Sequence, residues 1–372
     1  MPVAYTPGLR VTRDTIIRQQ RRLPMQGEVL VGIGDRVAAH DLVAVAEMPG
    51  NLHTLRAAQA LHVEPHELNA YLVRHPGDTV RSGDVIARTS GLWGLLKSEV
   101  RSPIAGTMEE VSATSGHIRL REPPKRVEVR AHIAGEIAEI IRGEGAVVQA
   151  RGALVQGIFG VGGERRGRLR LITEGADHPL SAQAISDCEG CVLVAGAGAD
   201  GEAIRRGAES GAAGLVVGAV TDEALRDYIG YDIGVAITGQ EDISMTLIIT
   251  EGFGELPMAQ RTWELLVSLQ GQLASINGAT QIRAGVVRPE IIVTREQPRA
   301  SEPEISPAQM LLVGGRVRVI REPHFGALGR VTALPPELTE IETESHVRIA
   351  RVRLDNGDEV RVPRANLELI QE

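Results

Sequence analysis

The chain has 372 residues, enough for two or three domains. Its apolar content of 43% and charged content of 24% predict a folded protein and exclude a disordered one, and a net charge of −8 disfavours an all-round nucleic-acid-binding surface. No apolar run reaches the length of a membrane-spanning helix, and the N-terminus lacks a secretory pattern, so we expect a cytoplasmic protein without membrane contact. The 42 glycines and 19 prolines indicate many short strands joined by tight turns.

Residues 1–25 are expected to form a basic N-terminal arm. Between positions 10 and 22 a single acid, Asp14, stands among five arginines: Arg10, Arg13, Arg18, Arg21 and Arg22. Such a cluster can follow the phosphates of a nucleic acid or bind an acidic partner. A solvated terminus is the more common role of a short charge run, and both readings stay open.

Residues 26–165 contain an internal repeat. The stretch 34–44 recurs as 77–87, and 104–111 recurs as 133–140, while a looser third copy begins at Gly145. Apolar alternation broken by glycine turns predicts short β-strands. Residues 55–72 between the first two copies follow helical spacing, and we expect a packed helical insert there rather than a DNA-binding helix pair.

The repeated units resemble the biotinyl/lipoyl-like family, whose fold is a barrel-sandwich hybrid of short strands. The resemblance implies an all-β sandwich for residues 26–165, of a kind that also occurs in RNA polymerase large subunits and ion-pumping quinone reductases. In carrier members of the family, a lysine on a hairpin between the two repeats is covalently modified, and Lys97 is the candidate here. Its flanking residues depart from the carrier pattern, so we expect an unmodified lysine and no cofactor.

Residues 166–293 alternate aliphatic runs with helical segments, which predicts a small α/β domain with a parallel sheet. The expected strands are 191–195, 214–220, 235–237 and 246–250, and the expected helices are 202–209, 222–228 and 258–269.

This region contains a G-x-G-x-x-G pattern, formed by Gly196, Gly198 and Gly201, with Asp222 after the next expected strand. A dinucleotide site needs such a loop, because backbone N–H groups hold the pyrophosphate and the acid binds ribose hydroxyls. A glycine-rich chain also produces the pattern by chance, which is the favoured interpretation. Cys188 and the nearby second cysteine are expected to be reduced structural thiols and not a redox pair, and no metal site is expected.

A second candidate ligand pocket lies at the carboxyl end of an expected strand, where α/β folds bind ligands. It combines Gly252, Phe253 and Gly254 with the polar side chains of Asn277, Thr280 and Arg283. The alternative is that the polar residues satisfy a turn. No catalytic acid–base pair or nucleophile accompanies them, so no catalytic residue is assigned.

Residues 294–308 read as a Pro/Ser/Glu linker that leaves the orientation of the C-terminal region variable. In residues 309–372, Pro323, Phe325 and Gly329 follow an alternating apolar stretch. This resembles the KOW motif of NusG-type factors and ribosomal proteins, which implies an SH3-like β-barrel that docks on RNA or protein. A hairpin turning at residues 355–358 and a β-bulge near Ala350 are expected within it.

The expected architecture is therefore multidomain: a barrel-sandwich hybrid, a small α/β parallel-sheet domain and an SH3-like barrel. We expect a non-enzymatic assembly or adaptor protein that docks on transcription or translation machinery, with RNA polymerase or the ribosome as possible partners. Two alternatives stay open. One is a nucleotide- or phosphate-binding α/β domain with a regulatory or enzymatic role, and the other is a self-assembling homo-oligomer.

Overall fold

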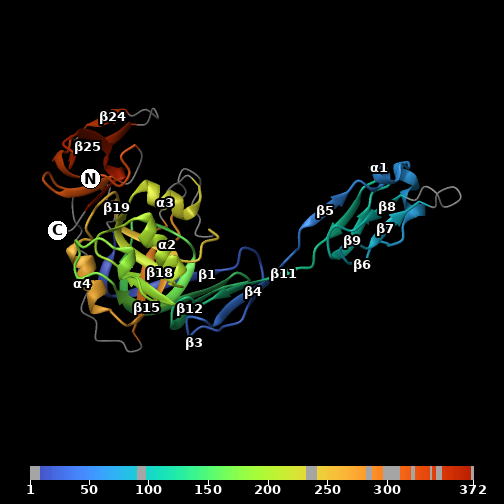
Figure 1. Ribbon diagram of the computed structural model, residues 1–372, viewed down its shortest axis with the longest axis horizontal. Helices are drawn as coiled ribbons and strands as arrows, with labels where there is room; N and C mark the ends of the chain where they lie inside the picture. The colour runs from blue at the N-terminus through green and yellow to red at the C-terminus, as the bar shows by residue number, and fades with distance from the viewer. Residues whose placement is uncertain are drawn as a thin grey trace.

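The computed structural model describes residues 9–89, 98–231, 241–281, 287–295, 311–319, 323–335, 337–340 and 346–369. Within them the protein is multidomain and mostly β. Figure 1 shows a central body, a small β unit that projects far from it, and a C-terminal unit against the other end of the body. In the described part of the chain, no helix has the length and apolar character needed to cross a membrane.

The inner β unit, residues 11–48 and 125–156, packs two sheets around one apolar core. One sheet has the order β1-β13-β12-β3 and the other β11-β4-β2. Val43, Ile133 and Ile137 are fully buried between them. The strands are β1 (Val11–Arg22), β2 (Glu28–Val29), β3 (Arg36–Val37), β4 (Leu42–Met48), β11 (Lys125–Arg130), β12 (Gly135–Ile141) and β13 (Gly145–Gln156).

The segment expected to be a basic arm is instead a strand of this unit. β1 pairs antiparallel with β13 over most of its length. Ile17 and Thr15 point into the protein, while the arginines at 18 and 22 point outward. The run of arginines conceals a period-two apolar pattern, which is why composition alone misassigned it.

The outer β unit, residues 52–121, has its own apolar core. Its sheet has the order β5-β10-β9-β6, and β7 pairs with β8 in a separate hairpin. As expected, the helical insert packs onto this core, because Ala57, Leu61 and Leu68 are buried in it. Its elements are β5 (Leu52–Leu55), α1 (Ala57–Leu61), η1 (Pro65–Tyr71), β6 (Thr79–Val80), β7 (Val85–Arg88), β8 (Glu99–Arg101), β9 (Gly106–Val111) and β10 (Ile118–Arg121).

The inner and outer units are two copies of one design, the outer nested inside the inner. The order β5-β10-β9-β6 corresponds to β1-β13-β12-β3, and the hairpin β7-β8 corresponds to β4-β11. The turns match as well: the Asp35 carboxylate accepts from the amide of Gly32 at 2.7 Å, and the Asp78 carboxylate from the amide of His75 at 2.8 Å. The outer copy is therefore inserted at the tip of the β4–β11 hairpin of the inner one. The looser third copy at Gly145 is different, since it is part of the continuous strand β13.

The α/β region has the expected alternation. β15, β16, β18 and β19 form a parallel set, with antiparallel β14 and β20 beside it. α2 and α3 cover one face and α4 the other. The elements are β14 (Phe159–Val161), β15 (Glu164–Leu171), η3 (Ala182–Ala184), β16 (Cys191–Val194), β17 (Gly198–Ala199), α2 (Gly201–Glu209), β18 (Gly214–Val220), α3 (Asp222–Ile229), β19 (Thr246–Phe253), α4 (Gln260–Ser268), β20 (Leu273–Asn277) and β21 (Glu290–Thr294). The strand expected at 235–237 lies outside the described residues.

The boundary expected between residues 165 and 166 does not separate two sheets. It falls inside β15, and β20 and β21 continue the α/β sheet directly into β13 of the inner unit. One sheet thus runs through the whole body in the order β14-β19-β18-β16-β15-β20-β21-β13-β12-β3. Backbone pairing can continue across a change in side-chain composition, so the composition shift did not mark a structural break.

The C-terminal unit is a small antiparallel β structure around Val317, Val331 and Val352. The expected hairpin joins β25 and β26, but pairing is regular through Ala350, so the expected bulge is wrong there. The register shift lies on β23 between Val331 and Ala333. The elements are β22 (Arg316–Val319), β23 (Leu328–Ala333), β24 (Leu338–Glu340), β25 (His346–Leu354), β26 (Glu359–Pro363), η4 (Arg364–Asn366) and β27 (Leu367–Leu369).

Candidate functional site

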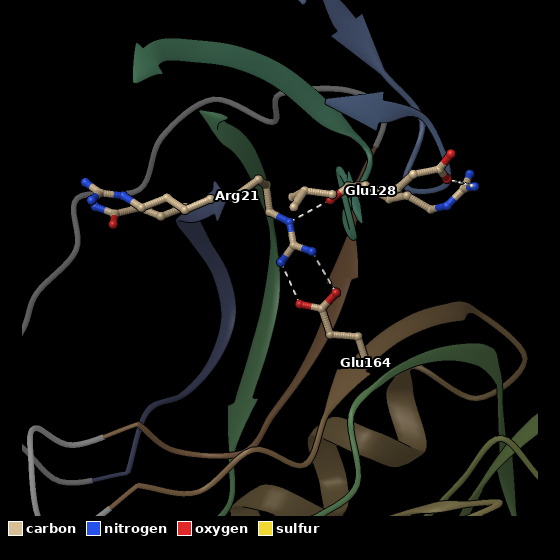
Figure 2. A pocket seen from close by; sticks show the side chains of 7 residues that line it. Arg21, Glu128 and Glu164 are labelled. Atoms are coloured by element: carbon tan, nitrogen blue, oxygen red, sulfur yellow. Dashed lines mark hydrogen bonds and ion pairs between the residues drawn. The ribbon is translucent and has the colours of Figure 1, made fainter. Parts of the chain in front are cut away.

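An open groove of about 480 Å³ lies where the inner unit meets the α/β sheet (Figure 2). Its two sides are strand segments of three residues each, 20–22 of β1 and 128–130 of β11, and Glu164 at the start of β15 forms its floor. The groove lies at a structural junction, because three segments of the chain that are distant in the sequence supply its walls.

Arg21 spans this groove, as Figure 2 shows. Its guanidinium donates two hydrogen bonds to the Glu164 carboxylate, at 2.5 and 2.7 Å, and its Nε donates to the carbonyl oxygen of Arg130 at 2.6 Å. Burial is the largest single influence and raises the pKa of Glu164, but the hydrogen bonds from Arg21, together with the charges of His132 and Arg21, outweigh it and hold that pKa below its usual value. The pair is therefore ionised at neutral pH and fixed in a bidentate geometry.

His132 lies behind this ion pair. Its side chain is 3% exposed, and its Nδ1 is 3.6 Å from a carboxylate oxygen of Glu164. Its backbone φ of 67° is in the left-handed region, which is uncommon for residues other than glycine, and its Nε2 has no hydrogen-bond partner in the described structure. Burial, reinforced by the charges of Arg21 and Arg166, lowers the pKa of His132 to about 4, so the imidazole is neutral at pH 7.

Replacing His132 by asparagine, which tolerates the left-handed conformation, should flatten the pH dependence of stability. The pKa falls from an ordinary value of 6.5 to about 4 on folding. The unfolded chain thus binds the extra proton, and the stabilisation present above pH 6.5 is lost as the pH falls towards 4. Urea unfolding should show a wild-type loss of about 2 kcal/mol between pH 7 and pH 5 that His132→Asn lacks. His40, whose side chain is exposed, is the control position: its replacement by asparagine should leave the wild-type loss of stability unchanged. Equal losses of stability in His132→Asn and wild type would contradict the assignment.

A polar row continues from the groove across the sheet. Glu164, Asn277 and Glu290 are register partners on three adjacent strands. Gln19 donates to Glu290 at 2.6 Å, and burial raises the pKa of Glu290. This row of side chains can form hydrogen bonds and contains two carboxyl groups. Among the described residues, no cluster of three His, Cys, Asp or Glu side chains could hold a metal ion.

The glycine-rich loop is pinned within the fold. The Gly196 amide donates to the Thr173 hydroxyl at 2.9 Å, and β17 holds Gly198 in register with Ala219. α2 begins at Gly201, while Asp222 is the first residue of α3. The Gly196 amide and the strand that contains Gly198 already have partners within the protein, so this loop offers less to a pyrophosphate than the pattern suggested.

The second candidate pocket is occupied by other residues of the same chain. Phe253 packs against Phe325 of the C-terminal unit, with ring centroids 6.1 Å apart, and Gly326 lies over Gly252, while Gly254 has open space beside it. On the other side, the Asn277 side chain accepts from the amide of Ala279, and the Thr280 hydroxyl accepts from the amide of Gly160 at 2.8 Å. These polar groups are thus engaged within the fold, Asn277 in a turn and Thr280 with the distant Gly160. Arg283 lies outside the described residues.

The arginines predicted to form a basic arm are largely engaged within the protein. Arg18 pairs with Glu139 and Arg22 with Glu144, each at 3.2 Å, and the Arg10 guanidinium donates to Thr15. Arg13 is exposed. The cluster is thus a strand face whose arginines form ion pairs and hydrogen bonds within the protein.

The cysteines, Lys97 and the residues of the KOW-like motif are the other positions singled out in the sequence. Cys188 is buried and Cys191 partly so, and both are free thiols. Lys97 lies outside the described residues. Gly329 is inside β23, and Pro323 and Phe325 lie in the turn before that strand.

A buried ionic network joins the C-terminal unit to the α/β sheet. Arg318 of β22, 2% exposed, pairs with Glu251 of β19 at 2.8 Å and with Glu368 of β27 at 3.4 Å. Arg288 pairs with Glu368 at 3.1 Å. The C-terminal unit is docked by these contacts, which differs from the variable orientation expected from the linker, most of which lies outside the described residues.

A comparison of the chain with protein-family models and with curated proteins finds no match. No local pattern in the sequence marks the groove. Its β1 residues lie more than a hundred positions before the other residues that line it, and only the period-two pattern of β1, hidden by arginines, could have placed Arg21 in a sheet.

Proposed function

We propose that this chain is a non-enzymatic assembly or adaptor protein that presents its outer β unit to a protein partner. The observation that carries the proposal is the shape in Figure 1: the outer unit stands clear of the body on two chain crossings. It has a sealed apolar core of its own, so its surface is available without unfolding of the body.

The neck between the units is short and supported. The last body pair is Met48 with Lys125 in β4 and β11. Beyond it, the guanidinium of Arg121 donates to the Gly50 carbonyl at 3.1 Å, and the amide of Glu122 to the carbonyl of Asn51 at 3.0 Å. Two consecutive prolines, 123 and 124, fix φ in the returning chain. Such a neck holds a docking unit at a distance from its support.

The proposed partner class rests on the two family resemblances found in the sequence. Units of the lipoyl-like and KOW kinds occur in RNA polymerase, elongation factors and ribosomal proteins, so transcription or translation machinery is the partner class we propose. The C-terminal unit packs the partly buried Phe325 against the body of the same chain. This leaves the outer unit as the more available docking element.

The test removes the outer unit cleanly. Because Met48 and Lys125 are antiparallel partners, residues 49–124 can be replaced by a two-residue Asn-Gly turn. The full chain should capture polymerase or ribosomal subunits from its host, and the shortened chain should not. Capture of the same subunits by the shortened chain would refute the role of the outer unit, and capture of the chain itself alone would favour the homo-oligomer.

A further inference from the structure

β15 lies where two apolar cores on one face of the continuous sheet end. On one side, Arg170 is the register partner of Leu193, which is buried beneath α2 and α3. On the other side, Arg166 is in register through Ser275 with Ile292, which is buried in the core of the inner unit. This face of β15 therefore lies in a gap between the two cores, and arginines occupy the gap.

Three arginines of β15 share this face. Arg166, Arg168 and Arg170, here called the arginine row, alternate along the strand, and Leu169 is buried against α4 on the opposite face. Side chains on one face of a strand recur about every 6.6 Å. Arg168 is exposed and its register partner Leu273 is 46% exposed, so the middle of the row is open to solvent.

The charges of the arginine row are not neutralised within the described part of the chain. No member forms an ion pair there: Arg168 donates to the carbonyl of Gly271 at 2.9 Å, and Arg170 to uncharged groups of residues 186–188. The half-buried Arg166 has a buried Nε without a hydrogen-bond partner among the described residues. The β1 arginines that line the groove in Figure 2 are, by contrast, ion-paired with glutamates. A partly buried cation without a counter-charge is unfavourable, so a bound anion would stabilise the row.

We propose that the arginine row binds the phosphate backbone of a single-stranded nucleic acid. Guanidinium groups bind phosphate oxygens in bidentate geometry, and the phosphates of an extended strand recur at an interval similar to that of the row. The row presents three cations and little apolar surface, which favours a nucleic acid over an acidic protein, because protein interfaces have an apolar core. The half-buried position of Arg166 suits a narrow, flexible strand. This binding is additional to the adaptor role and does not involve the outer unit.

The first measurement is the salt dependence of binding, because each arginine that contacts a phosphate releases counter-ions. Fluorescence anisotropy with a labelled oligouridylate of about twelve nucleotides reports it. Three phosphate contacts should give a slope of log K against log salt of about −2, which is a roughly 20-fold loss of affinity between 50 and 200 mM salt. Arg168→Gln should make the slope shallower by about 0.7, and glutamine at all three positions should abolish binding. Absence of binding by wild type at 50 mM salt, or an unchanged slope in the triple variant, would overturn the proposal.

The matched control is Arg81→Gln, which removes the same charge from an exposed position of the outer unit, far from β15 in Figure 1. It should leave the slope unchanged, and Arg168→Lys, which keeps the charge in the row, should do the same. Equal effects of Arg81→Gln and Arg168→Gln would show that net charge and not the row determines binding. Thermal melting establishes that each variant is folded, and if the triple variant is not, the change at the exposed Arg168 decides.

Two further probes distinguish phosphate contacts from contacts with an acidic protein. An oligonucleotide of the same length with neutral methylphosphonate linkages should bind about tenfold more weakly or less well still, because phosphate contacts dominate affinity. Poly-glutamate of matched charge should compete poorly with the oligouridylate. Undiminished binding of the methylphosphonate strand, or equally effective competition by poly-glutamate, would refute the nucleic-acid assignment.

Discussion

Replacing Arg318 by methionine is expected to destabilise the docked C-terminal unit by about 3–5 kcal/mol. The change keeps the volume roughly but leaves two carboxylates, those of Glu251 and Glu368, without their shared counter-charge. Glu368 is 1% exposed, and burial already raises its pKa even with Arg288 and Arg318 beside it. Loss of one of these cations exposes the full desolvation cost of a buried charge.

Chemical denaturation followed by the fluorescence of Trp263, one of two tryptophans and part of the α/β core, can be compared with far-UV circular dichroism. In Arg318→Met, the signal of the C-terminal β unit should be lost before the body unfolds. Arg316→Met is the matched control on the same strand, since its ion pair with Asp355 is solvent-exposed and should contribute ~1 kcal/mol or less. Indistinguishable midpoints for the two variants would show that the buried network does not hold the unit.

Valine in place of Gly329 is expected to prevent folding of the C-terminal unit. A Cβ at this position would lie 2.5 Å from the Arg353 carbonyl oxygen and 2.8 Å from a methyl carbon of Val352, both inside the paired β23–β25 ladder. Neither neighbour can move without breaking the core, so the cost should reach at least about 3 kcal/mol.

The isolated fragment beginning near residue 309 and the full chain can both be measured for this variant. Ala333→Val adds similar bulk to the same strand at a half-buried position and should be tolerated within about 1 kcal/mol. An undiminished cooperative melt of Gly329→Val would mean that β23 does not pair with β25 as described.

Local patterns in the sequence predicted local structure well. The α/β alternation, the helical insert and the hairpin at residues 355–358 follow from periodicity and turn chemistry, and all are present. The repeat at residues 34 and 77 was visible as a pattern, but its nesting was not. Nesting depends on which strands pair, and β5 and β1 share no sequence signature that reveals their equivalence.

Pairing between residues distant in the sequence could not be predicted from local patterns. Arg318 alternates with apolar residues in β22, a pattern typical of a solvent-facing position, yet it is buried. Its partner Glu251 lies more than sixty residues away in the sequence, in another sheet. Arg21 and Glu164 are likewise joined only by the fold. Buried ion pairs have no local signature, since each partner alone looks like a surface residue.

The central claim is that the outer β unit is a separate copy displayed by a self-sufficient body, and calorimetry tests it most directly. The chain in which Asn-Gly replaces residues 49–124 should lose one transition while the body transition stays within about 4 °C of its original temperature. Its pairing of β4 with β11 is retained, so no body contact beyond the neck is removed. Disappearance or a large downward shift of the body transition would show that the two copies stabilise each other and that the outer unit is not a displayed module.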